Sequence, residues 1–284
     1  MNKQGKLVNG KVIGGIEWTK TVLPDGTERQ GFTNNAIPGC EHDCEWEMPD
    51  GTRIVCYAKT TAERGAAKAA YPHGFAHPYP FNEATLRKPL GHKTPARIFV
   101  DSMGDLFGAW VTWADIAKCF ALYREAHWHT FLSLTKNPAR LRAIPAALLP
   151  LPPNLHVGFS SPADWMRGHV LTPAQKERWT HAALNVWDTL PAAVRWMSIE
   201  PLAWDIAPVL AEHRPLDWAV IGAASDGAKK HQPDPRHLEN LLTVLDAQRV
   251  PVFFKGNLKA SPHREFLPGF TPTAWNEAEH LESQ

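Results

Sequence analysis

The stretch PGCEHDCEWEMPDGTRIVCYA, residues 38–58, holds three of the four cysteines of this chain. Three residues separate Cys40 from Cys44, and eleven separate Cys44 from Cys56. The turn signal Asp50-Gly51 stands ahead of the apolar pair Ile54-Val55, which predicts a hairpin within residues 45–55. Such a hairpin would carry Cys56 back toward the other two cysteines, so the stretch predicts three thiols at one place.

The segments that follow alternate between short apolar runs and longer amphipathic stretches. Strands are predicted at residues 96–100, 130–134, 154–159, 194–198, 218–221 and 251–254, with an earlier one at 33–37. Helices are predicted at residues 57–70, 113–126, 139–148, 172–190 and 235–248. This alternation is typical of parallel strands joined by crossover helices.

Nearly every predicted strand ends in small or polar residues. In (β/α) barrels the carboxyl ends of the strands build the active site. The sequence therefore predicts an α/β fold, specifically a partial (β/α) barrel, with an open doubly wound sheet as the alternative.

The length of 284 residues fits one domain with extensions. We expect residues 1–32 to be an N-terminal extension packed on the barrel. Residues 33–258 are the predicted barrel, with the hairpin inserted in its cysteine loop. Residues 259–284 are the predicted C-terminal tail, whose proline and acidic residues are typical of a surface extension.

The charge balance of 30 basic and 29 acidic residues gives no overall field toward nucleic acid or anionic lipid. A local strip of Lys229, Lys230, Lys255, Lys259 and Arg264 could still follow phosphates. No apolar run approaches the ~20 residues that span a bilayer, and residues 1–6 (MNKQGK) lack the apolar region of a secretion signal. The sequence therefore predicts no membrane partner and a cytoplasmic protein.

Clustered cysteines in a chain that can build its own core favour metal ligation over a disulfide framework. Three thiolates can hold a cubane cluster by three irons and leave the fourth iron free for a small molecule. A zinc site on Cys40, Cys44 and Cys56, with His42 or another histidine as fourth ligand, fits the same spacing. The polar strand ends favour the cluster, because a structural zinc site does not need them.

Eight strings of residues then carry a resemblance. They are IEWT (16–19), PGC (38–40), CYA (56–58), FVDSMGDLF (99–107), LTK (134–136), VGFS (157–160), SIEPL (198–202) and FFK (253–255). In this order they resemble a three-cysteine-motif family of phage and bacterial radical SAM-like proteins, distantly similar to spore photoproduct lyase. Two departures are the long gap before Cys56 and Gly222-Ala223-Ala224-Ser225 where the family has Gly-Gly-Glu-Ser.

The resemblance implies a partial barrel of the radical SAM type, with a [4Fe-4S] cluster on Cys40, Cys44 and Cys56. It also implies S-adenosylmethionine as co-substrate and an external one-electron reductant such as a flavodoxin-like protein. The activity would be that of an isomerase, a lyase or a base-modifying enzyme. A nucleotide or nucleic acid, such as a modified pyrimidine in phage DNA as in thymidine hypermodification, is the expected substrate. The host would be a bacterial or phage-infected cell.

Strand-end residues supply the remaining candidates, each with a simpler alternative. Ser102 and Asp105 could bind the cofactor, although Asp105 could equally cap a helix. Lys136, beside Thr135, could hold a carboxylate or phosphate or be solvated. Ser160 could contact the cofactor or cap a turn.

Two further candidates, Glu200 and Lys255, follow later predicted strands. Glu200 could accept hydrogen bonds from the cofactor or pair with a lysine, and Lys255 could meet substrate charge or give a proton to a product radical. The resemblance adds Tyr57 and Ser198 to the cofactor-binding set. We expect Cys119 in the core and no metal on His73 and His77. The competing function is a zinc-stabilised, non-catalytic nucleic-acid-binding barrel.

Overall fold

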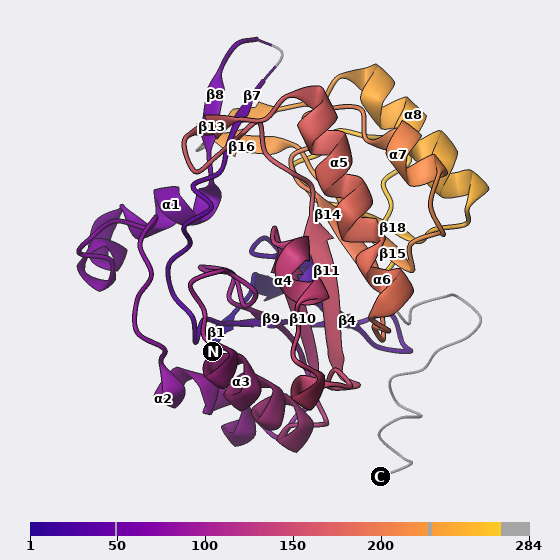
Figure 1. Ribbon diagram of the computed structural model, residues 1–284. Coiled ribbons are helices and arrows are strands. Elements are labelled where there is room, and N and C mark those ends of the chain that lie inside the picture. Colours follow the sequence, from indigo (N-terminus) through magenta and orange to yellow (C-terminus); the bar gives the residue numbers. More distant parts are fainter. Residues whose placement is uncertain (49, 227–228, 268–284) are drawn as a thin grey trace.

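The computed structural model describes residues 1–48, 50–226 and 229–267 (Figure 1). Its central sheet has eight strands, of which only the edge strand β1 runs antiparallel to its neighbour. In spatial order they are β1 (Asn2–Lys3), β6 (Phe32–Asn34), β9 (Arg97–Val100), β10 (Thr130–Thr135), β11 (Leu155–Ser160), β14 (Trp196–Ile199), β15 (Trp218–Ile221) and β18 (Val252–Phe254). All seven predicted strands are present, so the α/β prediction is confirmed.

The parallel strands lie in the order in which they occur along the chain. A doubly wound sheet reverses its strand order at a switch point, so the doubly wound alternative is wrong. Within the described residues no pairing joins β6 to β18, and the sheet is therefore not a closed barrel.

The position of Trp18 shows that this sheet is strongly curved. In a flat sheet, the four strand spacings from β9 to β15 would span about 19 Å. The Trp18 ring nevertheless lies 4.7 Å from Phe99 on β9 and 6.1 Å from Trp218 on β15, centroid to centroid. The strands must therefore curl around Trp18, which the 3₁₀ turn Glu17–Thr19 places on their concave face.

Helices cover the other face of the sheet and lie in succession around it (Figure 1). The longest are α3 (Trp113–Glu125), α5 (Pro173–Leu184) and α8 (Pro235–Ala247), whose starts are capped by Thr112, Thr172 and Asp234. The shorter ones are α2 (Glu83–Leu86), α4 (Pro138–Arg142), α6 (Val186–Thr189) and α7 (Ala207–Ala211). Besides the 3₁₀ turn Glu17–Thr19, the described residues form 3₁₀ helices at Gly65–Ala70, Lys88–Gly91 and Ala146–Leu148.

Three predicted helices are shorter than expected. The helix expected at 57–70 stops as α1 (Tyr57–Ala62), because Gly65 adopts a φ of +52° that suits glycine and not a helix. The one expected at 139–148 is broken before Pro145, which lacks the N–H that a helix interior needs. The segment expected at 172–190 divides at Asn185 into α5 and α6.

The predicted hairpin in the cysteine loop is confirmed as β7 (Glu45–Glu47) paired with β8 (Arg53–Val55). Strands β12 (Trp165–Met166) and β13 (His169–Val170), which the sequence did not predict, extend it into a four-stranded sheet. Three small hairpins pair β2 (Lys6–Val8) with β3 (Lys11–Ile13), β4 (Thr21–Val22) with β5 (Glu28–Arg29), and β16 (Ala224–Asp226) with β17 (Lys229–His231).

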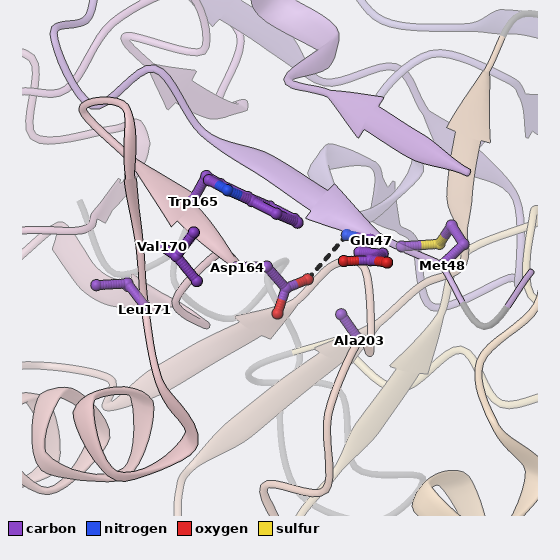
Figure 2. A pocket seen from close by; sticks show the side chains of 7 residues that line it. All are labelled: Glu47, Met48, Asp164, Trp165, Val170, Leu171 and Ala203. Atoms are coloured by element: carbon purple, nitrogen blue, oxygen red, sulfur yellow. Dashed lines mark hydrogen bonds between the residues drawn. The ribbon is translucent and has the colours of Figure 1, made fainter. Parts of the chain in front are cut away.

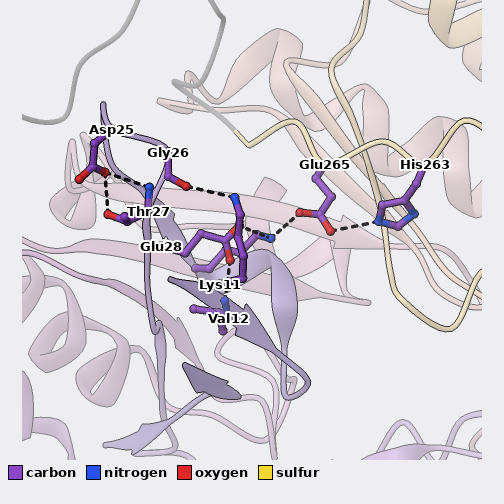
Figure 3. A network of polar contacts seen from close by, with 9 residues as sticks. Lys11, Val12, Asp25, Gly26, Thr27, Glu28, His263 and Glu265 are labelled. Carbon is purple, nitrogen blue, oxygen red and sulfur yellow. Dashed lines mark hydrogen bonds and ion pairs between the residues drawn. The ribbon is translucent and has the colours of Figure 1, made fainter. Parts of the chain in front are cut away.

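The N-terminal segment is fastened to the end of the described chain by buried charges. Lys20, 3 % exposed, lies 3.0 Å from Glu28 and also pairs with Glu265 (Figure 3). Burial opposes the charge of Lys20, but the two carboxylates raise its pKa above the usual value. Residues 259–267 of the predicted tail thus pack on the sheet, with Leu267 3 % exposed, while residues 268–284 lie outside the described part. No helix in the described part is long and apolar enough to span a bilayer.

Candidate functional site

The cysteine loop docks on the turn after β9 through two glycines. Gly39 donates its N–H to the Met103 carbonyl at 2.9 Å, and Gly39 and Gly104 form a parallel bridge. A Cβ at Gly104 would lie 1.9 Å from the Ile37 carbonyl oxygen, and one at Gly39 would lie 2.0 Å from the His77 carbonyl oxygen. Only glycine allows backbones to approach this closely, so these residues set where Cys40 lies.

The three loop cysteines lie near one another at the carboxyl edge of the sheet. The Cys56 N–H donates to the Cys44 carbonyl at 3.0 Å, and Cys56 packs in the same apolar clusters as Cys40 and Cys44. Burial, then the charge of Asp105 and Cys44, raises the pKa of the Cys40 thiol. Burial raises the pKa of Cys44 to about 12, although nearby Lys136 acts to lower it. The thiols of Cys40 and Cys44 therefore keep their protons at neutral pH and would lose them to a bound metal.

Asp105 joins the cysteine loop to the end of β10. Its Oδ2 accepts from the Thr135 hydroxyl at 3.0 Å and the Lys136 N–H at 3.1 Å, and lies 2.8 Å from His42 Nε2. Asp105, His42 and Thr135 are each at most 4 % exposed. Asp105 and Thr135 thus bond to one another and join the loop to β10, and their contact with a cofactor stays a prediction.

Glu200 stands at the centre of a second group, at the carboxyl ends of β14, β15 and β18. The Ser198 hydroxyl donates to Glu200 Oε2 at 2.8 Å, and Lys255 Nζ lies 2.9 Å from Glu200 Oε1. Gly222 lies beside the pair, since a Cβ there would be 3.0 Å from Glu200 Oε1. The ion pair with a lysine, named as the simpler alternative, is present and leaves both side chains partly exposed at the strand ends.

Tyr57 connects the two groups. Its ring is half-exposed, while its hydroxyl donates to the Ser102 carbonyl at 2.7 Å. Burial of the hydroxyl and the charges of Cys56 and Glu200 raise the pKa of this phenol. The Ser102 hydroxyl donates to Asn35 Oδ1 at 3.0 Å. Asn35 was missed from the sequence, although its place directly after the first strand could have pointed to it.

The remaining candidate residues, Ser160, Cys119, His73 and His77, lie in three different parts of the molecule. Ser160 ends β11 opposite Ser198 and is partly exposed. Cys119 is fully buried in the core, as predicted. His73 and His77 lie in a loop with their rings 5.1 Å apart, near Tyr79.

The predicted basic strip is largely compensated by carboxylates. Lys229 lies 3.3 Å from Asp50, Lys255 pairs with Glu200, and Arg264 pairs with Asp246. The strip is therefore not a row of uncompensated positive charge.

The described His, Cys, Asp and Glu side chains form no ready metal site. Within the described residues, no three or more His, Cys, Asp and Glu side chains are arranged to hold one metal ion. The side chains of Cys40, Cys44 and Cys56 therefore form no such group within the described residues, and the [4Fe-4S] cluster and the zinc ion both stay predictions.

The family comparison matches residues 15–265 to a family described as "Protein of unknown function (DUF5131)". The chain belongs to this DUF5131 family. The match extends from the 3₁₀ turn that carries Trp18 to Glu265, so DUF5131 covers both the curved sheet and the cysteine loop. No curated protein matches the chain.

Proposed function

We propose that this DUF5131 protein is a radical SAM enzyme. The observation that carries the proposal is that the thiols of Cys40, Cys44 and Cys56 share one sheet edge with Glu200 and Lys255. We call these five residues the strand-end site. The order of the parallel strands and the curvature around Trp18 support a partial barrel of the radical SAM type.

The donor set fits a [4Fe-4S] cluster and S-adenosylmethionine. Three thiols would ligate three irons, and the fourth iron would be left for the cofactor. When bound, the cluster and S-adenosylmethionine would supply a 5'-deoxyadenosyl radical that abstracts hydrogen from a substrate.

The chain's own residues would bind, orient and shield. Glu200 carries a carboxylate oriented by Ser198 and Lys255, and so can accept hydrogen bonds from the amine or hydroxyls of a cofactor. Tyr57 lies near both Cys56 and Glu200, is held by its hydrogen bond to the Ser102 carbonyl, and would limit the access of water to a bound cofactor. Lys255 Nζ is partly exposed and can deliver a proton to a product at the same edge.

The test is anaerobic reconstitution with iron and sulfide, followed by assay for reductive cleavage of S-adenosylmethionine to 5'-deoxyadenosine. We expect a brown protein with about four irons per chain. Cys56→Ala should lose the cluster, while Cys119→Ala, a matched change outside the loop, should retain it. A reconstituted protein that holds its cluster but forms no 5'-deoxyadenosine would overturn the enzymatic proposal.

His42 favours a second candidate, a zinc-stabilised nucleic-acid-binding protein. Metal-ligating histidines usually give their other ring nitrogen to a carboxylate, and His42 Nε2 meets Asp105 in this way. His42 Nδ1 is buried and has no hydrogen-bond partner within the described residues. A colourless protein with one zinc per chain, lost in His42→Ala, would establish this candidate in place of the first.

A further inference from the structure

A pocket of about 380 Å³ lies beside the strand-end site (Figure 2). Its lining residues are Glu47, Met48, Asp164, Trp165, Val170, Leu171 and Ala203. Ala203 follows Glu200 by three residues, and Met48 shares an apolar cluster with Cys44 and Cys56. The hairpin that joins Cys44 to Cys56 thus forms one wall of the pocket.

The lining has the chemistry of a site for a flat, uncharged ring. Trp165 gives an aromatic wall, and Val170, Leu171 and Met48 give apolar sides (Figure 2). Aromatic walls of this kind stack nucleobases. The volume falls within the usual range of ligand pockets, roughly 300–1,000 Å³.

The charges in the lining are negative. The pocket residues named above include no Lys, Arg or His, and the Arg53 guanidinium, which lies over the Trp165 ring at 4.2 Å, is paired with Glu45; both disfavour a phosphate there. Asp164 is compensated by Lys176 at 2.7 Å and accepts the Glu47 N–H at 2.9 Å. The carboxylate of Glu47 makes no such pair within the described residues, and it is the open acceptor of the pocket.

We propose that the pocket binds a nucleobase that presents an exocyclic amino group to Glu47 while its ring stacks on Trp165. Carboxylates pair with the amino group of cytosine and reject the carbonyl that replaces it in uracil. This inference rests on the proposed function, since it names the substrate class of that enzyme, but its test does not depend on catalysis.

The experiment is calorimetric titration of the full chain, as purified and reconstituted, with cytidine and with its near-isostere uridine. Cytidine should bind about tenfold more tightly, the equivalent of one well-placed hydrogen-bonded pair. Glu47→Gln should abolish this preference, and Trp165→Ala should weaken both nucleosides. Glu239→Gln, an exposed change on α8, should alter neither.

Equal binding of cytidine and uridine, or a preference that survives Glu47→Gln, would overturn the inference. Absence of binding by either nucleoside would also overturn it. The cleavage of S-adenosylmethionine is measured separately, so a silent pocket in a protein that forms 5'-deoxyadenosine refutes only the inference. Cytidine binding by a protein that forms no 5'-deoxyadenosine refutes only the proposed function.

Discussion

The two ends of the curved sheet carry side chains of different chemistry, polar at one end and aromatic at the other. At the carboxyl ends of the strands lies the strand-end site, with its thiols, carboxylate and lysine. At the other end the concave face is filled by Trp18, Phe99, Trp196 and Trp218, which we call the aromatic base. Their ring centroids lie 4.7–6.1 Å apart in the measured pairs, and all four are at most 6 % exposed.

The difference teaches how one concave surface can be both core and site. Successive residues of a strand point to opposite faces, so Trp196 and Ser198 are inward positions of β14, and Glu200 follows directly after the strand. Large aromatic rings near the strand starts close the interior, and small or charged groups at the strand ends leave it open. We therefore expect changes at the aromatic base to affect stability and changes at the strand-end site to affect metal loading.

Replacing Trp18 with alanine should have the largest effect on stability. The change removes the ring around which the strands curl and should cost about 3–5 kcal/mol of unfolding free energy. Urea unfolding measures this loss, and Trp18→Phe should show a smaller one. Cluster loading of the folded variant at low temperature should match wild type. A variant of normal stability would refute the role given to the aromatic base.

Replacing Asp105 with asparagine should affect both stability and metal loading. An amide nitrogen in place of Oδ2 cannot accept from Thr135 and Lys136, which should cost about 1.5–3 kcal/mol. Iron per chain after reconstitution should fall because the loop is no longer held to β10. Asp115→Asn, at the start of α3, is the matched control and should keep full loading. Full loading in Asp105→Asn would show that the carboxylate does not position the loop.

The sequence predicted the strands because their apolar runs are short and their ends are polar. It also predicted the hairpin, since Asp50-Gly51 marks a turn that needs no tertiary contact. It could not predict β12 and β13, because two-residue strands carry no period: β12 is defined by pairing with β7, and β13 by pairing with β12.

For the site, the sequence predicted which residues are candidates but not which of them contact one another. Polar residue types at strand ends singled out Glu200 and Lys255 as candidates and allowed an ion pair of Glu200 with a lysine, but did not show that Lys255 is that lysine. The sequence named Asp105 and Thr135 as separate cofactor-binding candidates but did not show that they bond to one another, since side-chain partners depend on distances that spacing does not encode. Trp18 was visible only as part of a motif, and its curvature-setting role required the packed sheet.

Replacing Gly104 with alanine should affect the loop more than the sheet. The added methyl would lie 1.9 Å from the Ile37 carbonyl oxygen, so the backbone around Cys40 must shift. We expect a loss of about 1–3 kcal/mol and a broadened electron paramagnetic resonance signal of the reduced cluster. Gly168→Ala, in the turn between β12 and β13, is the control. Its methyl would meet no atom within 4 Å, but the φ of +74° strains an alanine backbone, so this variant shows the effect of backbone strain without crowding. Identical spectra for Gly104→Ala and wild type would contradict the docking role.

Replacing Asp101 with asparagine should have the smallest effect, and its sign depends on pH. Asp101 is 4 % exposed, its Oδ1 accepts the Ile37 N–H at 2.8 Å, and burial raises its pKa to about 8. Because the folded pKa lies above that of the unfolded chain, the stability that this group supports is complete below about pH 4 and is lost as the pH rises to about 8. Asparagine keeps the acceptor, tolerates the φ of +53°, and cannot ionise.

The variant should therefore gain stability relative to wild type as the pH rises from about 5 to about 8.5. Urea midpoints at the two pH values measure the gain, and Asp115→Asn should show no comparable change. A difference between Asp101→Asn and wild type that is the same at both pH values would mean that Asp101 is ionised throughout. In that case a charged carboxylate would hold the loop before Cys40. The charged edge of the sheet would then begin at Asp101, directly after β9.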